Sequence, residues 1–393
     1  MAIYLDHAAT SPMTREVLEA YTAALTLVGN PSSIHSQGQN SKRMLEEARE
    51  QVAVSLGADA VEVTFTSGGT ESINLGIKGL YWAQNPAPVH PRPRVLIAAG
   101  EHHATIDAAE WLARYEGAIV EEVAIDEFGR IDLVALEAAL GDDVAVLSIL
   151  LANNEVGTIQ PIADVAALAA SRGVPVHLDA VAAYGYLPID FHALGVAALS
   201  VSAHKIGGPV GVGALLIARS ATIVPLIHGG NQQRGRSGTQ DAAGAVAFGV
   251  AAREATTNIQ ARATALAMLR DRLIDGVQAA VPTAILRGDP VQRLSGNAHF
   301  TFPGCEGDSL LFLLDVAGFS VSTGSACQAG VPEASHVLLA MGLSEADARG
   351  ALRMTVGHET TEAEVDAFVA ALPAAVSGAS RAGLSDRVVG MGV

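Results

Sequence analysis

The chain has 393 residues, of which half are hydrophobic and 17% are charged, and its formal net charge is −17. This composition is typical of a globular protein with a large core and excludes a disordered chain, while the length favours two domains. The negative charge argues against a general nucleic-acid or anionic-membrane surface, and no apolar stretch has the length of a membrane span. The N-terminus has no secretory signal pattern, and two cysteines cannot form a disulfide framework, so we expect a cytoplasmic protein.

Apolar runs of strand length alternate with segments of helical periodicity through the first 258 residues. The predicted strands are residues 61–66, 95–99, 144–151, 174–178, 199–202 and 212–218, and the helical segments include 45–56, 73–80 and 162–170. Because the strand runs are continuously apolar, the strands should be covered on both faces, as in a mostly parallel sheet. The pattern predicts an α/β fold built from βαβ units.

Beyond residue 258 the pattern changes. A long helical run at residues 259–277 precedes segments around 296–302 and 318–322 that resemble antiparallel strands. We interpret this region as a smaller α+β domain. The predicted organisation is a large domain at 16–258, a small domain formed by 1–15 and 259–377, and a loose Gly-, Ser- and Arg-rich tail at 378–393.

Residues 66–72, Thr-Ser-Gly-Gly-Thr-Glu-Ser, follow a predicted strand and open a helix. Glycines let backbone N–H groups approach an anion closely, and a helix N-terminus favours negative charge. Gly69 and Thr70 are therefore the expected donors to a phosphate. The alternative is an ordinary capping turn, since Ser and Thr are common N-caps.

Polar residues follow two other predicted strands. In an open α/β sheet, ligands bind beyond the carboxyl ends of the strands, so a histidine after residues 95–99 could lie over a flat cofactor ring. His102 is the candidate for this position, and for His103 we favour a surface histidine. After the strand at 144–151, the Asn154 amide could bond a ring oxygen or form an Asx turn.

Lys205 is one of three lysines in the chain and closes an apolar run that leads into Ile-Gly-Gly. Asp179 ends another such run, 26 residues earlier. A lysine and an aspartate at the ends of neighbouring strands suit a pyridoxal phosphate (PLP) enzyme, in which lysine forms the Schiff base and the carboxylate pairs with the pyridinium nitrogen. The alternative is that Lys205 is a solvated strand terminus. Ser202 and His204 are suited to donate to a phosphate.

Three further segments carry candidate groups. Residues 228–239 form a polar loop with two arginines, as expected beside an anionic ligand. Cys327 lies among small residues at 322–330 and is predicted to be a nucleophile, whereas Cys305 is expected to be a buried hydrophobe. Arg353 could hold a substrate carboxylate by a bidentate pair, or form a simple surface salt bridge.

Together these segments resemble the NifS/IscS-type cysteine desulfurases, PLP enzymes of the aminotransferase class V group. The likeness runs from residues 4–10 (Tyr-Leu-Asp-His-Ala-Ala-Thr) through 29–35 (Gly-Asn-Pro-Ser-Ser-Ile-His) to 360–364 (Thr-Thr-Glu-Ala-Glu), in the family's order and spacing. It covers nearly the whole chain apart from the tail. The resemblance implies the PLP-dependent transferase fold type I and a homodimer whose small domain carries the reactive cysteine.

The resemblance also implies a role for each candidate residue. Lys205 would form the Schiff base and shuttle the substrate Cα proton, Asp179 would hold the pyridinium nitrogen, and His102 would stack on the ring. Cys327 would attack the substrate sulfur and carry the persulfide. The remaining implied contacts are Gly69, Thr70, Ser202, His204 and the partner subunit's Thr239 for the phosphate, Asn154 for cofactor or substrate, and Asn30 and Arg353 for the substrate carboxylate.

The implied activity is the conversion of L-cysteine to L-alanine, with the sulfur handed from Cys327 to an acceptor protein such as a scaffold or a thiolation enzyme. Desulfurases of this type serve iron–sulfur cluster assembly, tRNA thiolation, cofactor sulfuration and DNA phosphorothioation, and the sequence does not choose among them. We expect no metal, no direct nucleic-acid contact and no membrane contact.

The chain departs from the family pattern at three places, and the first of them, the loss of a glutamine hydrogen bond, predicts weaker or slower turnover. Ala182 replaces a glutamine that bonds the PLP ring oxygen, Ile73 replaces Asn or Asp, and the loop at 228–239 is one residue shorter than usual. One rival interpretation is a selenocysteine lyase or an aminotransferase on the same scaffold, of which the aminotransferase would not need Cys327. The other is a catalytically weakened partner-binding homologue. Ala182 and Ile73 support it, whereas the intact site residues argue against it, namely Lys205, Asp179, His102 and Cys327.

Overall fold

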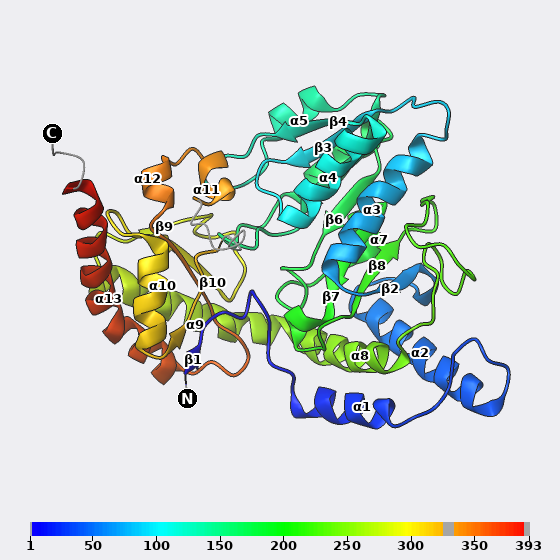
Figure 1. Cartoon of the computed structure of the whole chain (residues 1–393), viewed down its shortest axis with the longest axis horizontal. Helices are drawn as coiled ribbons and strands as arrows, with labels where there is room; N and C mark the ends of the chain where they lie inside the picture. Colours follow the sequence, from blue (N-terminus) through cyan, green and yellow to red (C-terminus); the bar gives the residue numbers. More distant parts are fainter. Residues whose placement is uncertain (1, 325–333, 389–393) are drawn as a thin grey trace.

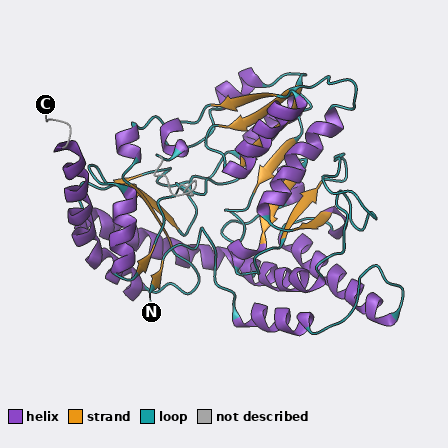
Figure 2. Ribbon diagram, viewed as in Figure 1, coloured by secondary structure: helices purple, strands orange, loops and turns teal. Residues whose placement is uncertain are grey.

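The structure is a computed structural model that describes residues 2–324 and 334–388, with side chains as far as residue 380. A seven-stranded sheet flanked by helices forms the larger part, and two small sheets with long helices lie beside it (Figure 1). Figure 2 shows the same arrangement by secondary structure. Within the described ranges, no helix has both the length and the hydropathy needed to cross a bilayer.

The seven-stranded sheet has the order β2-β8-β7-β6-β5-β3-β4, and it is parallel except at β8, which runs antiparallel to both of its neighbours. This confirms the predicted α/β fold with a mostly parallel sheet. The strands are β2 (Val63–Thr66), β3 (Arg94–Ala98), β4 (Ile119–Val123), β5 (Val144–Leu150), β6 (Val176–Asp179), β7 (Ala198–Ser202) and β8 (Gly213–Ile217).

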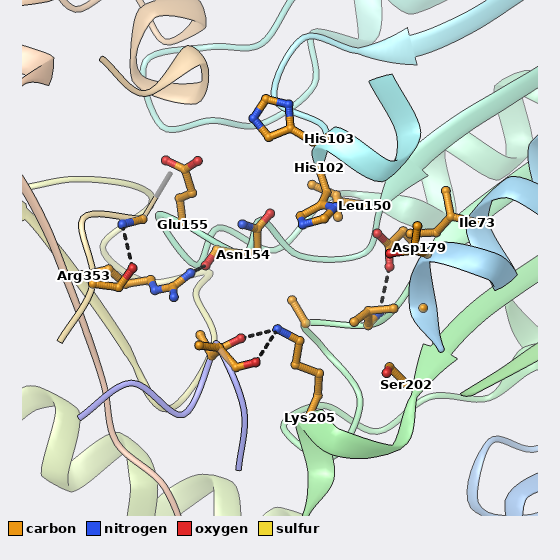
Figure 3. A pocket seen from close by; sticks show the side chains of 18 of the residues that line it. Ile73, His102, His103, Leu150, Asn154, Glu155, Asp179, Ser202, Lys205 and Arg353 are labelled. Carbon is orange, nitrogen blue, oxygen red and sulfur yellow. Dashed lines mark hydrogen bonds between the residues drawn. The ribbon is translucent and has the colours of Figure 1, made fainter. Parts of the chain in front are cut away.

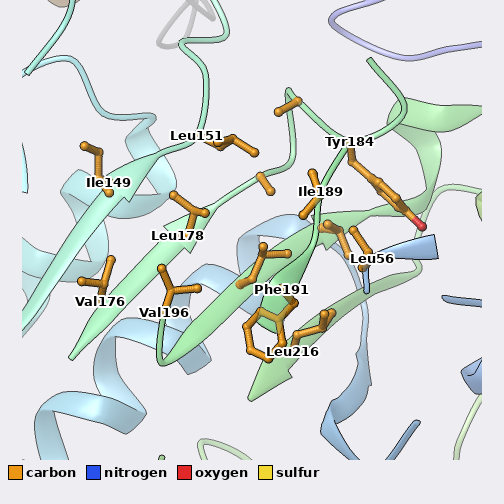
Figure 4. Close-up of a cluster of buried hydrophobic side chains, with 14 of the residues drawn as sticks. Leu56, Ile149, Leu151, Val176, Leu178, Tyr184, Ile189, Phe191, Val196 and Leu216 are labelled. Carbon is orange, nitrogen blue, oxygen red and sulfur yellow. The ribbon is translucent and has the colours of Figure 1, made fainter. Parts of the chain in front are cut away.

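Both faces of this sheet are covered, which explains the continuously apolar strands. Leu215 and Leu216 are successive residues of β8, both fully buried, and they belong to different hydrophobic clusters because neighbouring side chains point to opposite faces. Figure 4 shows one of these clusters, in which Leu56, Ile149 and Leu178 pack together with Leu216.

The helices of the larger part surround the sheet, with α3 packed against α4, β7 and β8, and α8 packed against α1 and α2. They are α1 (Arg15–Leu25), α2 (Ser36–Ser55), α3 (Gly69–Gln84), α4 (His103–Glu116), α5 (Leu133–Ala139), α6 (Ile162–Ser171), α7 (Phe191–Leu194) and α8 (Ala242–Thr256), with short 3₁₀ turns η1 (Ala60–Glu62) and η2 (Ala203–Ile206).

The smaller part contains two sheets. In one, β10 (Asn297–Thr301) runs antiparallel between β12 (Ala351–Thr355) and β9 (Ile285–Leu286). In the other, β11 (Phe319–Ser320) pairs in parallel with β1 (Ile3–Tyr4). The prediction of an antiparallel strand around 318–322 is therefore wrong for β11, whose partner comes from the opposite end of the chain, although Ser322 forms an antiparallel bridge with Arg353.

Long helices cover the small sheets and share a core with them, in which Leu273, Phe300, Leu310 and Phe368 are buried. The helix α13 packs against both α9 and α10. The helices of this part are α9 (Ile259–Ala280), α10 (Gly307–Val316), α11 (His336–Ala340), α12 (Glu345–Ala348) and α13 (Glu362–Val388).

The C-terminal segment differs from the expected loose tail, because α13 continues to Val388. Ala375 and Ala379 are buried in the core that the small sheets share with their helices, and this packing stabilises the helix beyond residue 378. A single glycine inside a helix costs about 1 kcal/mol relative to alanine, which this packing outweighs at Gly378. Residues 389–393 lie outside the described part of the chain.

Candidate active site

A cavity of about 410 Å³ lies where β5, β6 and β7 end, and residues of the small-sheet part also line it. Its size suits a small-molecule ligand, and the carboxyl ends of parallel strands are the usual place for one. Figure 3 shows Lys205, Asp179 and His102 around this pocket, with Asn154 and Arg353 along another side of it.

Lys205 lies in η2, immediately after β7, so the expected position beyond a strand is observed. Its Nζ donates hydrogen bonds to the carbonyl oxygens of Ala8, at 2.5 Å, and Ala9, at 3.1 Å. Burial and the positive charge of Arg353 together lower the pKa of Lys205 to about 8. The lysine is therefore a largely buried amine that is partly neutral near physiological pH, not a solvated terminus.

Asp179 is the last residue of β6 and its carboxylate is buried in the pocket wall. Its Oδ1 accepts a hydrogen bond of 2.9 Å from the Val181 N–H. Burial raises the pKa of Asp179 to about 6. A buried carboxylate with so little solvation is stabilised by a cation placed against it, such as a protonated ring nitrogen.

His102 is the N-cap of α4, and its Nδ1 accepts a hydrogen bond of 3.1 Å from the Ala104 N–H. Burial lowers the pKa of His102 to about 4, with a further contribution from Lys205, so the ring is neutral at physiological pH. His103 also lines the pocket, and its ring lies 4.8 Å from that of His336. The prediction that His103 is a plain surface histidine is therefore wrong.

The predicted phosphate-binding residues Gly69, Thr70, Ser202 and His204 all line the same pocket. The helix α3, of 16 residues, begins at Gly69, so its N-terminal turn opens there. A Cβ at Gly69 would lie 2.9 Å from Val181 Cγ2, so a larger residue there would require the Val181 side chain to move. Ser202 Oγ is buried and has no hydrogen-bond partner in the described ranges, as expected of a group that awaits a ligand.

Arg353 lies on β12, and its guanidinium is only 6% exposed. Nη1 donates to the Asn154 carbonyl oxygen at 2.8 Å and Nη2 to Asp6 Oδ1 at 3.0 Å. Among the described residues, Arg353 Nε and Asn154 Oδ1 have no partner. Arg353 is thus a buried cation in the pocket wall rather than part of a surface salt bridge.

Two predicted site residues, Asn30 and Thr239, are not brought into this pocket, and a third lies outside the described part of the chain. Asn30 is exposed in the turn after α1, where its Oδ1 accepts from the Ser32 N–H at 2.9 Å. Thr239 is also exposed and does not line the pocket. Cys327 lies outside the described residues, although Gly324, which precedes its segment, lines the pocket.

Residues 3–368 match the family described as aminotransferase class-V. The chain belongs to this family. It is 52% identical to an IscS-like cysteine desulfurase of Mycobacterium tuberculosis over 97% of this chain and 98% of that protein. A solved NifS-like protein is similar with a TM-score of 0.89 and 34% identity, covering 96% of this chain and all of that one. The structure of SspA in complex with cysteine is 31% identical with a TM-score of 0.77, covering 90% and 98% of the two chains.

Membership of this family implies PLP as the cofactor, and the pocket fits it. The unpartnered Ser202 Oγ and the helix that begins at Gly69 suit a phosphate. Asp179 offers a buried carboxylate for the ring nitrogen, and Lys205 offers an amine for a covalent bond. The likeness to NifS-like structures also confirms the predicted fold type.

The departures from the family pattern have visible consequences. Ala182 and Ile73 both line the pocket, so each presents an apolar side chain to the ligand space. In the loop at 228–239, Arg234 donates to the carbonyl oxygens of Ile217 and two neighbouring residues, and Arg236 pairs with Glu71 at 2.5 Å. Both arginines have protein partners within one chain, and their expected position beside an anionic ligand stays a prediction.

Sequence reasoning missed Glu155 and His336 as pocket residues. A signal existed for Glu155, because it directly follows Asn154 in the turn after β5. For His336 there was none, since its helix α11 comes from a distant part of the chain and only the tertiary fold brings it to His103.

Proposed function

We propose that the protein is a PLP-dependent cysteine desulfurase that converts L-cysteine to L-alanine and captures the sulfur on Cys327. The observation that carries the proposal is one pocket that combines Lys205, Asp179 and Arg353, which are an amine, a buried acid and a buried cation. The 52% identity to an IscS-like cysteine desulfurase supports the activity. The similarity to a protein solved in complex with cysteine supports the substrate.

Each side chain has a distinct role in this proposal. When bound, PLP withdraws electrons from the substrate Cα and so makes its proton acidic. Lys205 holds the cofactor and then takes and returns the Cα proton, a task that suits an amine whose pKa is about 8. Asp179 keeps the ring nitrogen protonated by pairing with it. The neutral ring of His102 stacks on the cofactor and excludes water from one face.

The substrate is held at both ends. Arg353 binds its carboxylate by a bidentate pair, and the Asn154 amide contacts the cofactor or substrate. The phosphate of the cofactor is bound by Gly69, Thr70, Ser202 and His204.

The Cys327 thiolate then attacks the substrate sulfur. A sulfur–sulfur bond forms and the Cβ–sulfur bond breaks. The electron pair of the broken bond remains on Cβ, which gains a proton to give alanine.

We further propose that the active unit is a homodimer, with a large domain at 16–258 and a small domain formed by 1–15 and 259–377, extended by the rest of α13 to Val388. Thr239 and Asn30 are exposed in one chain. In a homodimer a second chain would cover them, and they could then contact a ligand. Near Asn30, Val28 is 86% exposed and Ile34 is 92% exposed, which is apolar surface that a second subunit would bury. A sulfur-acceptor protein, such as a scaffold or thiolation enzyme, then receives the persulfide in the cytoplasm.

The proposal is tested by incubating the PLP-loaded protein with L-cysteine and a thiol reductant and measuring alanine and sulfide. We expect both products from the wild type, none from Lys205→Ala, and a strong loss with Cys327→Ser. If the wild type released no alanine, the proposed desulfurase activity would be contradicted. Full turnover by Cys327→Ser would favour an aminotransferase on the same scaffold, and selenide release with far higher kcat/KM from L-selenocysteine would favour a lyase.

A further inference from the structure

Glu155 is hydrogen-bonded to one flank of the segment 325–333 and lies close to the other. On one side, Ser335 Oγ donates a hydrogen bond of 2.5 Å to Glu155 Oε2. On the other side, a Cβ added to Gly324 would lie 3.3 Å from the same Oε2 and 3.2 Å from His299 Nε2. Gly324 has φ +93°, a backbone conformation that favours glycine. One carboxylate therefore bonds to Ser335 and occupies the space that a side chain at residue 324 would need, on the two flanks of the segment that carries Cys327.

The backbone of Glu155 is itself held firmly. Its N–H donates to Asn153 Oδ1 at 2.9 Å, and its carbonyl oxygen accepts from Asn297 Nδ2 at 3.1 Å. Asn153 Nδ2 in turn donates to the Gly100 carbonyl oxygen at 2.9 Å. Glu155 is 2% exposed, so its carboxylate is placed before any ligand arrives.

The same turn also holds the substrate side of the pocket. The carbonyl oxygen of Asn154 accepts from Arg353, while the next side chain, Glu155, accepts from Ser335 (Figure 3 shows Asn154, Glu155 and Arg353 together). Asn154 and Glu155, which are consecutive, thus link Arg353 with Ser335, which lies on one flank of the segment that carries Cys327. A displacement of the turn would move both.

The charge of Glu155 is balanced from several elements. His103 on α4, His336 on α11 and Arg353 on β12 all favour its ionised form, against the burial that raises the pKa of Glu155. A buried carboxylate costs free energy unless it is paired and hydrogen-bonded. Here its side-chain hydrogen bond goes to Ser335, on the flank of the Cys327 segment.

We propose that Glu155 is a positioning residue for sulfur transfer. It keeps Gly324 and Ser335 at a fixed position relative to Arg353, across the pocket. The inference rests on the proposed function, because it takes Cys327 as the group that accepts the sulfur. It assigns Glu155 no contact with the reacting atoms.

The experiment compares Glu155→Gln, Glu155→Ala and Ser335→Ala in the PLP-loaded protein. Two readouts are taken: kcat and KM for alanine release, and the rate at which iodoacetamide alkylates Cys327, measured by peptide mass spectrometry. Cys305 is 3% exposed and serves as an internal reference that should react slowly in every variant. Glu62→Gln is the matched control, since Glu62 is 3% exposed and bonded to His192 outside this pocket.

We expect Glu155→Ala to lower kcat about tenfold and to change the Cys327 alkylation rate about threefold or more, since a hydrogen bond to a charged group is lost. Cofactor absorbance should be retained and KM should change little. Glu155→Gln keeps an acceptor for Ser335 and should be milder, and Glu62→Gln should behave as wild type. The effects of Glu155→Ala and Ser335→Ala should be less than additive in the double variant.

The inference is overturned if kcat and the alkylation rate of both Glu155 variants match those of Glu62→Gln, or if the two alanine substitutions are fully additive. It is also overturned if the whole loss appears in KM or in cofactor content. Should Glu155→Ala not fold, Glu155→Gln and Ser335→Ala carry the same comparison. A wild type that releases no alanine would contradict the proposed function, while the alkylation rates would still report whether Glu155 holds the flanks.

Discussion

Arg353 donates from Nη1 to the carbonyl oxygen of Asn154 at 2.8 Å, and this bond joins β12 of the small sheet to the turn that follows β5 of the large sheet. The pocket is therefore built across both parts of the molecule. The bond also fixes the plane of the guanidinium, and Nε has no partner in the part of the chain that the structure describes.

This geometry predicts the effect of Arg353→Lys. Lysine cannot make the planar two-point contact with a carboxylate, so KM for cysteine should rise by about tenfold or more while cofactor binding is retained. Steady-state kinetics together with the cofactor absorbance spectrum give both quantities. An unchanged KM would contradict the assignment of Arg353 to the substrate carboxylate.

Asp179→Asn should stabilise the cofactor-free protein and impair the loaded one. Folding raises the pKa of Asp179 from 3.8 to about 6, so the folded state binds the proton more tightly and loses stability as pH rises through this window. Above pH 6 the buried charge costs up to about 3 kcal/mol, which asparagine removes. Thermal unfolding of both apoproteins should differ at pH 8 and converge near pH 4. Cofactor affinity should fall in the variant, and equal apoprotein stability at pH 8 would refute the buried-charge argument.

The pKa of Lys205 predicts the pH dependence of cofactor loading. Only the neutral amine can form the covalent bond, and burial lowers the pKa of Lys205 to about 8. The loading rate of the apoprotein should rise about tenfold per pH unit below 8 and level off above it. Stopped-flow absorbance from pH 6 to 10 measures this, with Lys205→Arg as the control. A rate that still climbed at pH 10 would indicate an ordinary solvated lysine.

Ala182→Gln should strengthen cofactor binding. Ala182 lines the pocket, and a glutamine there restores the hydrogen bond to the ring oxygen that the family pattern implies. One neutral hydrogen bond is worth about 1 kcal/mol, or about fivefold in the dissociation constant. Fluorescence titration of the apoprotein with PLP and the rate of alanine formation test this. If the dissociation constant and the rate were both unchanged, Ala182 would not explain a weaker cofactor affinity or a slower turnover in this protein.

The large sheet was predictable because each of its central strands is apolar on both faces. Leu215 and Leu216 illustrate this, since each is buried in a different cluster. The edge strand β4 was missed because Glu121 and Glu122 lie within it and most of its side chains are partly or fully exposed. The pairing of β11 with β1 depends on a contact between the two ends of the chain, which periodicity cannot indicate.

The core of the site was also predictable, because Asp179 ends a buried strand and Lys205 and Asn154 lie shortly after the ends of two others, and parallel strands bring their carboxyl ends together. The contacts that hold these residues were not. The bonds of Lys205 Nζ to Ala8 and Ala9, and of Glu155 to Ser335, join segments about 200 residues apart in the sequence. No local pattern predicts such pairs.

The central claim is that Cys327 receives the sulfur that Lys205-dependent chemistry releases. The most direct measurement is a single turnover without reductant, in which alanine and the mass of the Cys327 peptide are followed together. The account predicts alanine and a one-sulfur mass increase on Cys327 in equal amounts, and neither product from Lys205→Ala. Alanine released with no sulfur on Cys327, or sulfur on Cys305 instead, would contradict it.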